Sequence, residues 1–450
     1  MYKMVFPQQH NRFFIWGIPA TLIAVYILLL YFTPRSNFFG TYAAFIFLFI
    51  GYFYIVKSEN LFSFKFCIAL AVLLRLIAVF SLPALSDDYF RFIWDGKMLL
   101  RHVNPFAFTP TEYLLTNSDT QLQFLYNNLI PESQQAYTVY PAILQYIFVV
   151  AAKIFPANPY AASVVMKLFI FSAECFSLYG LILISKLKKL PVRNVLLYAL
   201  NPLVIVELTG NVHFEALMIC FLLFTFYFLD KNKILPAALF WSLAICSKLL
   251  PVMLAPLFLM YLGFWRFFKA GLLTLLFSGL LFIPLINADF ISHIADSVGK
   301  YYTLFEFNGS FYYLFVRMTE VFTDKDYTES IALILGIISF CVVLFISILK
   351  FKRSLFYEIA LWVFFIYFLG AAMVHPWYIT TLVALCVFTR FKFPVVFSLL
   401  IPLSYFPYWL KVYDENMYII LLEYLLLFVY VLYESRRINK ARSKATENSF

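Results

Sequence analysis

Long apolar runs alternate with short polar segments along almost the whole chain. About 20 consecutive apolar residues cross the roughly 30 Å hydrocarbon core of a bilayer as a helix. Several of the runs are short or contain proline, so we expect an all-α, polytopic transmembrane helical bundle with about 12–14 spans. The candidate spans lie near residues 13–32, 37–56, 61–83, 160–185, 192–208, 214–229, 234–247, 248–264, 268–287, 329–349, 355–373, 376–390, 393–410 and 416–434.

The composition agrees with a protein whose solvent is the lipid bilayer. Of the 450 residues, 63% are hydrophobic and only 13% are charged, whereas an average soluble domain has roughly 25% charged residues. The first run, 13–32, is too long for a signal-peptide core and no small-residue cleavage site follows it, so we expect it to be retained as a span. The sequence therefore predicts a multi-pass integral membrane protein with one transmembrane domain over residues 1–450.

The longest polar stretch, residues 84–138, precedes a short apolar helix at about 139–156. If this helix does not cross the membrane and the N-terminus is cytoplasmic, 22 of the 34 Lys and Arg residues face the cytoplasm, 10 face outward and 2 lie within spans. If the helix crosses, most of the later basic clusters face outward, against the positive-inside rule. We therefore predict that 84–156 is an external loop with interfacial helices, 288–328 is a second external loop, and 435–450 is a basic cytoplasmic tail.

The net charge of +10 does not indicate a nucleic-acid partner. The basic residues form short clusters between apolar runs, as at 186–189, and such clusters are topology signals. The cytoplasmic loops are short and contain no G-x-x-x-x-G-K-[ST] phosphate cradle, so a cytosolic nucleotide-sugar is not the expected substrate. The six cysteines all fall inside apolar runs without a C-x-x-C spacing, so we expect neither a disulfide framework nor a zinc site.

Candidate acid–base chemistry is concentrated on the external side in this topology. The first external loop begins with Asp87 and Asp88, directly after a span. Adjacent carboxylates can hold a divalent cation such as Mg²⁺ or Mn²⁺, or one of them can act as a general base on a hydroxyl group. In the alternative interpretation, Asp87 only caps an interfacial helix. The residues alone leave both interpretations open.

Later spans have further polar residues at their external ends. Asn211, His213 and Glu215 lie together, and these neighbours raise His213 above an ordinary interfacial histidine. Lys248 lies between two apolar segments, where a cation is costly unless it reaches the interface or has a partner. It is either a snorkelling lysine or an anchor for a lipid phosphate.

Three more features have a structural alternative. Asn308 begins an Asn-Gly-Ser sequence that formally matches an N-glycosylation acceptor, but a binding loop fits its aromatic surroundings equally well. In the segment His375-Pro376-Trp377-Tyr378, we assign Trp377 to an aromatic belt and His375 to phosphate contact. Arg75 and Glu174 stand within apolar runs, and the hypothesis that they pair concerns structure rather than chemistry.

Taken in order, these segments resemble the integral-membrane glycosyltransferases of the C fold. The resemblance is to the bacterial polyprenol-phosphate-mannose-dependent mannosyltransferases and to the enzyme that adds the first mannose to GPI anchors. It covers about residues 80 to 390, although Ala142 stands where many relatives have a second proline and three spans precede the acidic loop. The matching pieces are Asp87-Asp88-Tyr89 through Asp95-Gly96, Asn104-Pro105-Phe106, Tyr140-Pro141, Asn201-Pro202 through Glu215, Ser247-Lys248-Leu249, Asn308-Gly309-Ser310 and His375-Pro376-Trp377-Tyr378.

The resemblance implies a hexosyltransferase of the mannosyltransferase type, with Asp87 or Asp88 as the catalytic residue. The donor would be a polyprenyl-phosphate-linked hexose, most simply mannose, and the acceptor a glycan or lipid-linked molecule of the cell envelope. Transfer would occur at the outer face of a bacterial inner membrane. The residues expected to bind substrate are Tyr89, Arg91, Asp95, Tyr140, Asn211, His213, Glu215, Lys248, Asn308, Arg317, His375 and Tyr378.

Two other classes of protein are weighed against this one. A membrane transporter or lipid-linked glycan flippase would also have many spans, but such proteins commonly contain internal repeats, and the sequence shows no clear repeat. A non-catalytic scaffold of a glycan assembly machine would have little reason to gather Asp, His and Asn at external span ends.

Overall fold

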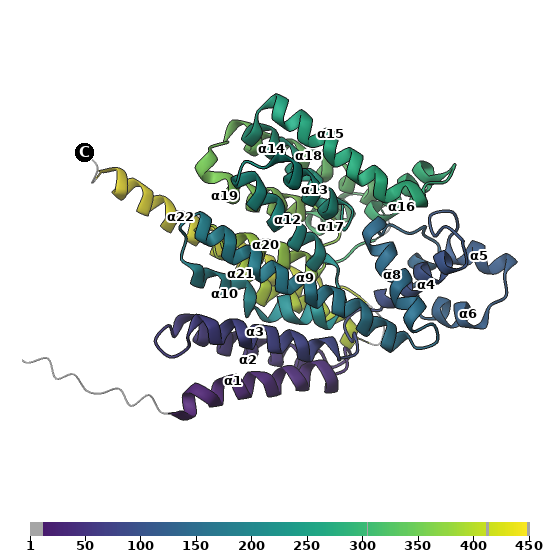
Figure 1. Cartoon of the computed structure of the whole chain (residues 1–450), viewed down its shortest axis with the longest axis horizontal. Coiled ribbons are helices and arrows are strands. Elements are labelled where there is room, and N and C mark those ends of the chain that lie inside the picture. Colours follow the sequence, from purple (N-terminus) through teal and green to yellow (C-terminus); the bar gives the residue numbers. More distant parts are fainter. Residues whose placement is uncertain (1–11, 304, 411–413, 448–450) are drawn as a thin grey trace, which may run out of the picture.

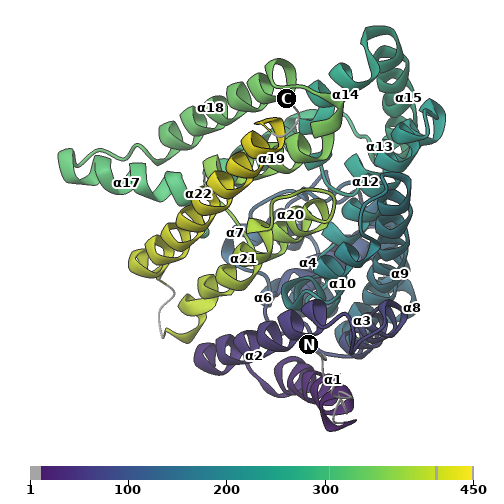
Figure 2. The ribbon, with the colours of Figure 1, turned by 90° about the vertical axis from the view of Figure 1, so that its left-hand side faces the viewer.

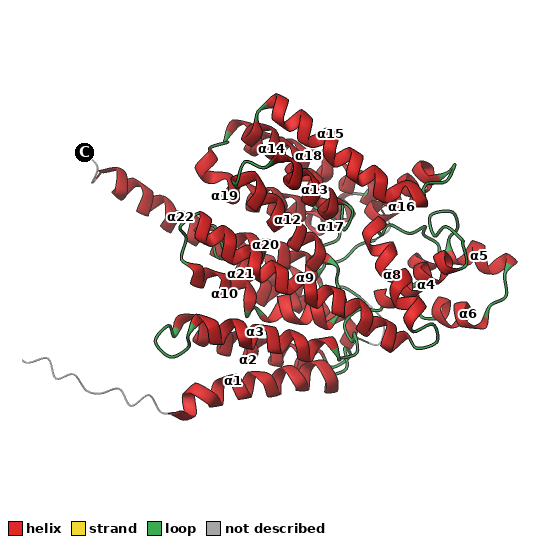
Figure 3. Ribbon diagram, viewed as in Figure 1, coloured by secondary structure: helices red, strands yellow, loops and turns green. Residues whose placement is uncertain are grey.

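The chain folds as a bundle of helices. The computed structural model describes residues 12–303, 305–410 and 414–447. In these residues every regular element is helical, and the single β-bridge joins Phe307 to Met373 (Figure 3). Among the described residues, six helices are long and apolar enough to cross a membrane, and the bent pair 192–199 and 202–210 has the length and composition of either a broken span or a re-entrant loop. The predicted fold class, a polytopic helical bundle, is confirmed.

The N-terminal third forms one edge of the bundle and a group of short helices beyond one end (Figure 1). The edge consists of α1 (Arg12–Ile27), η1 (Leu28–Phe32), α2 (Phe38–Lys57) and α3 (Phe64–Val79). The group beyond the end consists of α4 (Asp88–Leu100), α5 (Pro110–Thr116), α6 (Thr120–Asn127), α7 (Pro131–Gln134) and α8 (Ala142–Ile154). Because α8 has 13 residues, it is about 20 Å long, which is shorter than the hydrocarbon core.

The middle of the chain forms the centre of the bundle and the other edge. Its elements are α9 (Pro159–Leu187), η2 (Val192–Val195), α10 (Leu196–Ala199), α11 (Pro202–Val204), η3 (Ile205–Gly210), α12 (Glu215–Asp230), α13 (Ile234–Ile245), η4 (Leu250–Leu254), α14 (Ala255–Leu262), α15 (Phe264–Phe282) and η5 (Ile283–Leu285). Asn201 caps α11 by accepting hydrogen bonds from two backbone amides, and Pro202 starts that helix. This break bends the span by 54°.

The C-terminal part completes the bundle. Its elements are α16 (Phe290–Thr303), α17 (Ser310–Phe322), α18 (Thr328–Leu349), η6 (Arg353–Leu355), α19 (Phe356–Gly370), η7 (Pro376–Tyr378), α20 (Ile379–Cys386), α21 (Phe393–Leu400), η8 (Ile401–Trp409) and α22 (Met417–Glu447). Figure 2 shows α20 in the middle of the bundle, between α17–α18 on one side and α12 on the other, and all eight residues of α20 are buried. The predicted loop 288–328 thus contains two helices, and the predicted tail 435–450 is helical to Glu447, with residues 448–450 outside the described part.

Several of the predicted spans are short in the structure. Six apolar helical segments of 10–17 residues accompany the long ones, among them 376–386 and 393–409. Most of their breaks lie at proline, which starts a helix easily but cannot continue one. The fourteen apolar runs predicted from the sequence coincide closely with the long and short apolar helices of the structure. The number of helices that cross the bilayer remains a prediction.

Contacts between loops group them into two sets at opposite ends of the bundle. At one end, Arg193 donates hydrogen bonds to the carbonyl oxygens of Ile55 and Phe62, and Lys188 pairs with Asp230. At the other end, the backbone N–H of Leu85 donates to Asn211, and the N–H of Ile143 donates to the carbonyl of Cys246. These are the two sets of loops that the charge count assigns to opposite faces, and the assignment of either set to the external face stays a prediction.

The outer helices present apolar side chains to their surroundings. Only 17% of the apolar window of α15 and 28% of that of α18 are buried inside the bundle. Leu275 of α15 and Leu333 of α18, for example, are 72% and 66% exposed. Such surfaces are stable only against lipid, so the chain is an integral membrane protein.

A fully buried ion pair joins α3 to α9. The guanidinium Nε of Arg75 lies 2.8 Å from Oε2 of Glu174, and both side chains are 0% exposed. Arg75 also donates to the carbonyl oxygens of Ala71 and Ala199, at 3.1 and 2.6 Å. The hypothesis that these two residues pair is confirmed, and the pair fixes α3 against α9 and α10.

Removal of one partner of this pair should destabilise the bundle. Glu174→Gln leaves the charge of Arg75 buried without a counterion, so we expect a loss of about 3–5 kcal/mol. The measurement is thermal unfolding of the purified protein in detergent. Arg75→Met combined with Glu174→Met should recover most of the loss, and Glu329→Gln, which alters an exposed carboxylate, is the control. A melting temperature unchanged by Glu174→Gln would contradict this role.

Candidate active site

Ionisable side chains from four segments meet at the end of the bundle that carries α4. Asp88 begins α4, Glu215 begins α12, Lys248 follows α13, and His375 precedes η7. Lys248 forms an ion pair with Glu215, and its ammonium lies 3.9 Å from the ring centroid of Tyr378. We call the five residues Asp88, His213, Glu215, Lys248 and His375 the polar cluster. Five of the predicted site residues are thus brought together from segments up to 287 positions apart.

The two adjacent carboxylates differ in their surroundings. Asp87 occupies the N-cap position of α4 but makes no capping hydrogen bond. It pairs instead with Arg35, and both side chains are more than a third exposed. Asp88 is half-buried and, among the described residues, its carboxylate has no hydrogen-bond or ion-pair partner. Of the two, Asp88 is therefore the one available to a reacting group.

The pKa of Asp88 is shifted by its position in the polar cluster. Burial raises the pKa of this carboxyl above its usual value, while the proximity of His213 and the charge of Lys248 lower it and the neighbouring carboxylates Glu215 and Asp87 raise it further. The net shift is upward. A carboxylate with a raised pKa accepts a proton more readily at neutral pH than an ordinary one does, which suits a general base.

Beside the cluster lies Glu207, a carboxylate that the sequence analysis did not select. It belongs to the π-helical segment η3, and its side chain is fully buried. Its Oε1 accepts hydrogen bonds from the hydroxyl of Tyr405 at 2.5 Å and from the amide of Asn211 at 3.2 Å. The signal available in the sequence was an acidic residue inside an apolar run, which is rare and usually has a partner.

Glu207 determines which ring nitrogen of His213 carries the proton. Nδ1 of His213 lies 2.9 Å from the backbone oxygen of Glu207 and 3.3 Å from its Oε2, and both of these atoms are acceptors. The proton of a neutral imidazole is therefore on Nδ1. Nε2 is buried and has no hydrogen-bond partner among the described residues, so His213 is a second proton acceptor beside Asp88.

Trp377 is placed differently from the expectation of an aromatic belt. Its side chain is only 9% exposed. Its ring stacks on His213 at a centroid distance of 3.6 Å and on His375 at 4.2 Å. The indole therefore fixes the two imidazoles in space, and the expectation of a belt residue was wrong.

His375 is neutral in this environment. Burial lowers the pKa of His375 well below its usual value, and the positive charge of Lys248 and the proximity of His213 lower it further. Its Nδ1 is buried and has no hydrogen-bond partner among the described residues. Lys248 is thus the cation of the polar cluster, with a side chain 27% exposed and Glu215 as its counterion.

Asn211 connects the polar cluster to the chain that precedes α4. Its Oδ1 accepts the backbone N–H of Leu85 at 3.1 Å, and its Nδ2 donates to the carbonyl of Val206 and to Glu207. The next residue, Val212, has a φ of +63°, a conformation that a β-branched residue adopts only when its surroundings impose it. Asn211 thus positions the aspartates and does not reach the cluster itself.

Four predicted binding residues hold the external helices together. Arg91 pairs with Asp95 at 2.9 Å and donates to the carbonyl oxygens of residues 133 and 136. The fully buried Asp95 also accepts the hydroxyl of Thr138 at 2.5 Å. The rings of Tyr89 and Tyr140 pack on Phe90 and Phe92, at 4.2 and 4.9 Å.

Two predicted site residues lie away from the polar cluster in their contacts. Asn308, with a φ of +50°, donates its side-chain amide to Glu423 at 3.0 Å and its backbone N–H to Glu415. It thereby ties the segment before α17 to α22. Arg317 is 55% exposed and pairs with Glu320 on its own helix.

The described residues contain no group of three or more His, Cys, Asp and Glu side chains arranged to hold a metal ion. Asp87 and Asp88 do not share a partner, since Asp87 is paired with Arg35. The geometry instead combines a half-buried carboxylate, a partly exposed cation, the buried imidazole of His213 and the half-buried imidazole of His375 in one place. This combination can take a proton from a hydroxyl group and offset the negative charge of a phosphate.

Comparison with known proteins gives one match. The model of a family described as alpha-(1->6)-mannopyranosyltransferase, N-terminal domain, matches residues 38–263, half of the chain. The match includes Asp88, His213, Glu215 and Lys248 but ends before His375. No curated protein and no solved structure matches the chain. The chain belongs to the alpha-(1->6)-mannopyranosyltransferase family and is an integral-membrane glycosyltransferase.

Proposed function

We propose that the protein transfers a mannosyl group from a polyprenyl-phosphate donor to a glycan or lipid-linked acceptor at the external face of the membrane. The observation that carries the proposal is the meeting of Asp88 and Lys248 at one end of the bundle, with His213 and His375 beside them. A lipid-phosphate donor needs a cation at the membrane boundary, and an acceptor hydroxyl needs a base close to it.

In the proposed reaction, Asp88 accepts the proton of the acceptor hydroxyl. The acceptor oxygen forms a bond to C1 of the mannosyl group as the bond between C1 and the phosphate oxygen breaks. The electron pair leaves with the polyprenyl phosphate, and this single displacement inverts the configuration at C1. Asp88 then releases its proton to water.

Lys248 and His375 would act on the leaving phosphate. The ammonium of Lys248 offsets the charge that develops on the phosphate oxygen, and Glu215 holds Lys248 in place before the donor binds. His375, kept neutral by burial and by Lys248, offers a ring nitrogen without adding charge. The exposed Arg317, paired with Glu320, has no part in this proposal.

Replacement of the proposed base should separate the two aspartates. Asp88→Asn keeps the shape but removes the proton acceptor, so turnover with a polyprenyl-phosphate mannose should fall by about 100-fold to 10,000-fold. Folding raises the pKa of Asp88, so its ionised form costs stability at neutral pH, and the Asn variant should melt at the same or a higher temperature.

Asp87→Asn is the matched control for this experiment. It loses only an exposed ion pair with Arg35, which is worth at most about 1 kcal/mol. Its turnover should therefore stay within a few-fold of the unaltered protein. Normal turnover by Asp88→Asn, or a larger loss in Asp87→Asn, would contradict the assignment of Asp88 as the base.

The proposed phosphate anchor has a pH signature. Lys248→Met should raise the KM for the donor, because the phosphate loses its cation. It should also shift the acidic limb of the kcat/KM profile to higher pH, since the charge of Lys248 lowers the pKa of Asp88. Lys248→Arg keeps the positive charge, so the acidic limb of its kcat/KM profile should stay at the same pH as in the unaltered protein. If Lys248→Met leaves the donor KM unchanged, Lys248 does not bind the phosphate and only pairs with Glu215.

The proposed external site can be located by labelling. Single cysteines at Asn117, in the 84–156 region, and at Lys188 are treated with a membrane-impermeant thiol reagent in intact cells, in a background without the native cysteines. We expect position 117 to react and position 188 to react only after the cells are opened. The reverse pattern would place the polar cluster on the cytoplasmic face.

A further inference from the structure

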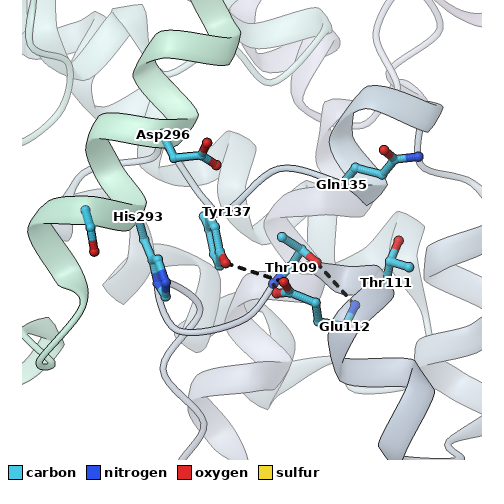
Figure 4. Close-up of a pocket in the computed structure, with 8 residues that line it drawn as sticks. Thr109, Thr111, Glu112, Gln135, Tyr137, His293 and Asp296 are labelled. Atoms are coloured by element: carbon cyan, nitrogen blue, oxygen red, sulfur yellow. Dashed lines mark hydrogen bonds between the residues drawn. The ribbon is translucent and has the colours of Figure 1, made fainter.

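We infer that a polar hollow between the external helices and α16 binds the neutral sugar chain of the acceptor. This inference rests on the proposed glycosyl transfer but concerns a separate surface. The hollow has a volume of about 520 Å³ and opens between α5, the segment after α7, and α16 (Figure 4). Its lining residues are Thr109, Thr111, Glu112, Gln135, Tyr137, Ser292, His293 and Asp296.

The size and polarity of the hollow suit a carbohydrate. Its volume lies within the roughly 300–1,000 Å³ that is typical of small-molecule sites. All eight lining side chains carry a hydrogen-bonding group. Such a surface can satisfy many hydroxyl groups, whereas a lipid tail would leave these polar groups without partners.

Charge separates this hollow from the site proposed for the donor phosphate. Its described lining includes Glu112 and Asp296 but no lysine or arginine. Like charges repel, so a phosphate is disfavoured there and favoured beside Lys248 in the polar cluster. The two surfaces therefore select ligands of different charge, a neutral sugar chain in the hollow and an anionic lipid headgroup at the cluster.

One wall of the hollow is held rigidly. The rings of Tyr137 and His293 stack at a centroid distance of 3.9 Å, with an interplanar angle of 6°. Nδ1 of His293 lies 2.8 Å from the carbonyl oxygen of Phe106, and the hydroxyl of Ser297 donates to the carbonyl of Tyr137 at 3.1 Å. The stacked rings offer a flat, pre-organised surface with a polar rim, which lowers the entropy cost of binding.

The hollow is mechanically joined to the helix that carries the proposed base. Arg91 of α4 donates to the carbonyl oxygens of Ser133 and Ala136, and Thr138 donates to Asp95 of α4. Hydrogen bonds to Arg91 and Asp95 therefore hold the segment that carries Gln135 and Tyr137 against α4. Asp88 and Asp95 are seven residues apart on one helix, about 10 Å along its axis. The hollow and the proposed base are thus carried by one connected set of external helices.

The test is direct binding of a neutral sugar chain to the full-length protein in detergent. The probe is phosphate-free α-(1→6)-mannotriose, with the dissociation constant measured by titration calorimetry. Asp296→Ala and Gln135→Ala each remove exposed hydrogen-bonding groups from the hollow. We expect Asp296→Ala to weaken binding by about tenfold or more, because it removes hydrogen bonds to a charged group, and Gln135→Ala, which removes hydrogen bonds to a neutral amide, to weaken it by about threefold to tenfold. Asp324→Ala removes an exposed carboxylate outside the hollow and should leave binding unchanged.

Absence of mannotriose binding to the unaltered protein, or equal affinity in all three variants, would overturn the inference. Binding that both hollow variants weaken would support it even if no mannosyl transfer occurs with a polyprenyl-phosphate donor. The absence of transfer in that case would count against the proposed function and not against the binding of a sugar chain in the hollow.

Discussion

The buried carboxylate of Glu207 is the interaction on which the arrangement of the site depends. An ionisable side chain deep in a membrane bundle is costly unless other side chains of the protein partner it. Glu207 draws on Tyr405, Asn211 and His213, which come from segments almost 200 residues apart. Through Asn211 it fixes the chain that enters α4, and through His213 it fixes the stack on Trp377. One acidic residue within a broken helix thus sets the position of the groups that surround Asp88.

The breaks in the helices are where the chemistry gathers. Regular membrane helices satisfy their own backbone and present side chains to lipid or to neighbouring helices. The segments 201–214, 246–250 and 371–378 leave that pattern, and each contributes a member of the polar cluster or a residue that supports it. The external helices add a rigid frame around Arg91 and Asp95, which fixes α4. Site and frame therefore have separate tasks. The broken spans supply Lys248 and the two histidines, and the external helices carry Asp88 and fix its position.

The sequence predicted the helices well because apolar runs of membrane length are a strong, local signal. It also predicted that Asp88, His213, Glu215, Lys248 and His375 belong to one site, although only the order of motifs linked them. It did not distinguish residues that face the cluster from residues that join structural elements, such as Arg91 and Asn308, because that depends on which partner each meets in the fold. Glu207 and the inward position of Trp377 were missed for the same reason. The hollow beside α16 arises only when distant loops meet.

The central claim is that the donor phosphate sits against Lys248, within reach of Asp88. A cryo-electron microscopy structure of the protein with a bound polyprenyl-phosphate mannose tests this most directly. The account predicts phosphate density in contact with Nζ of Lys248 and next to His375, with C1 of the sugar facing the carboxylate of Asp88. Phosphate density at Arg317 or inside the hollow lined by Asp296, with Asp88 remote from the sugar, would contradict it.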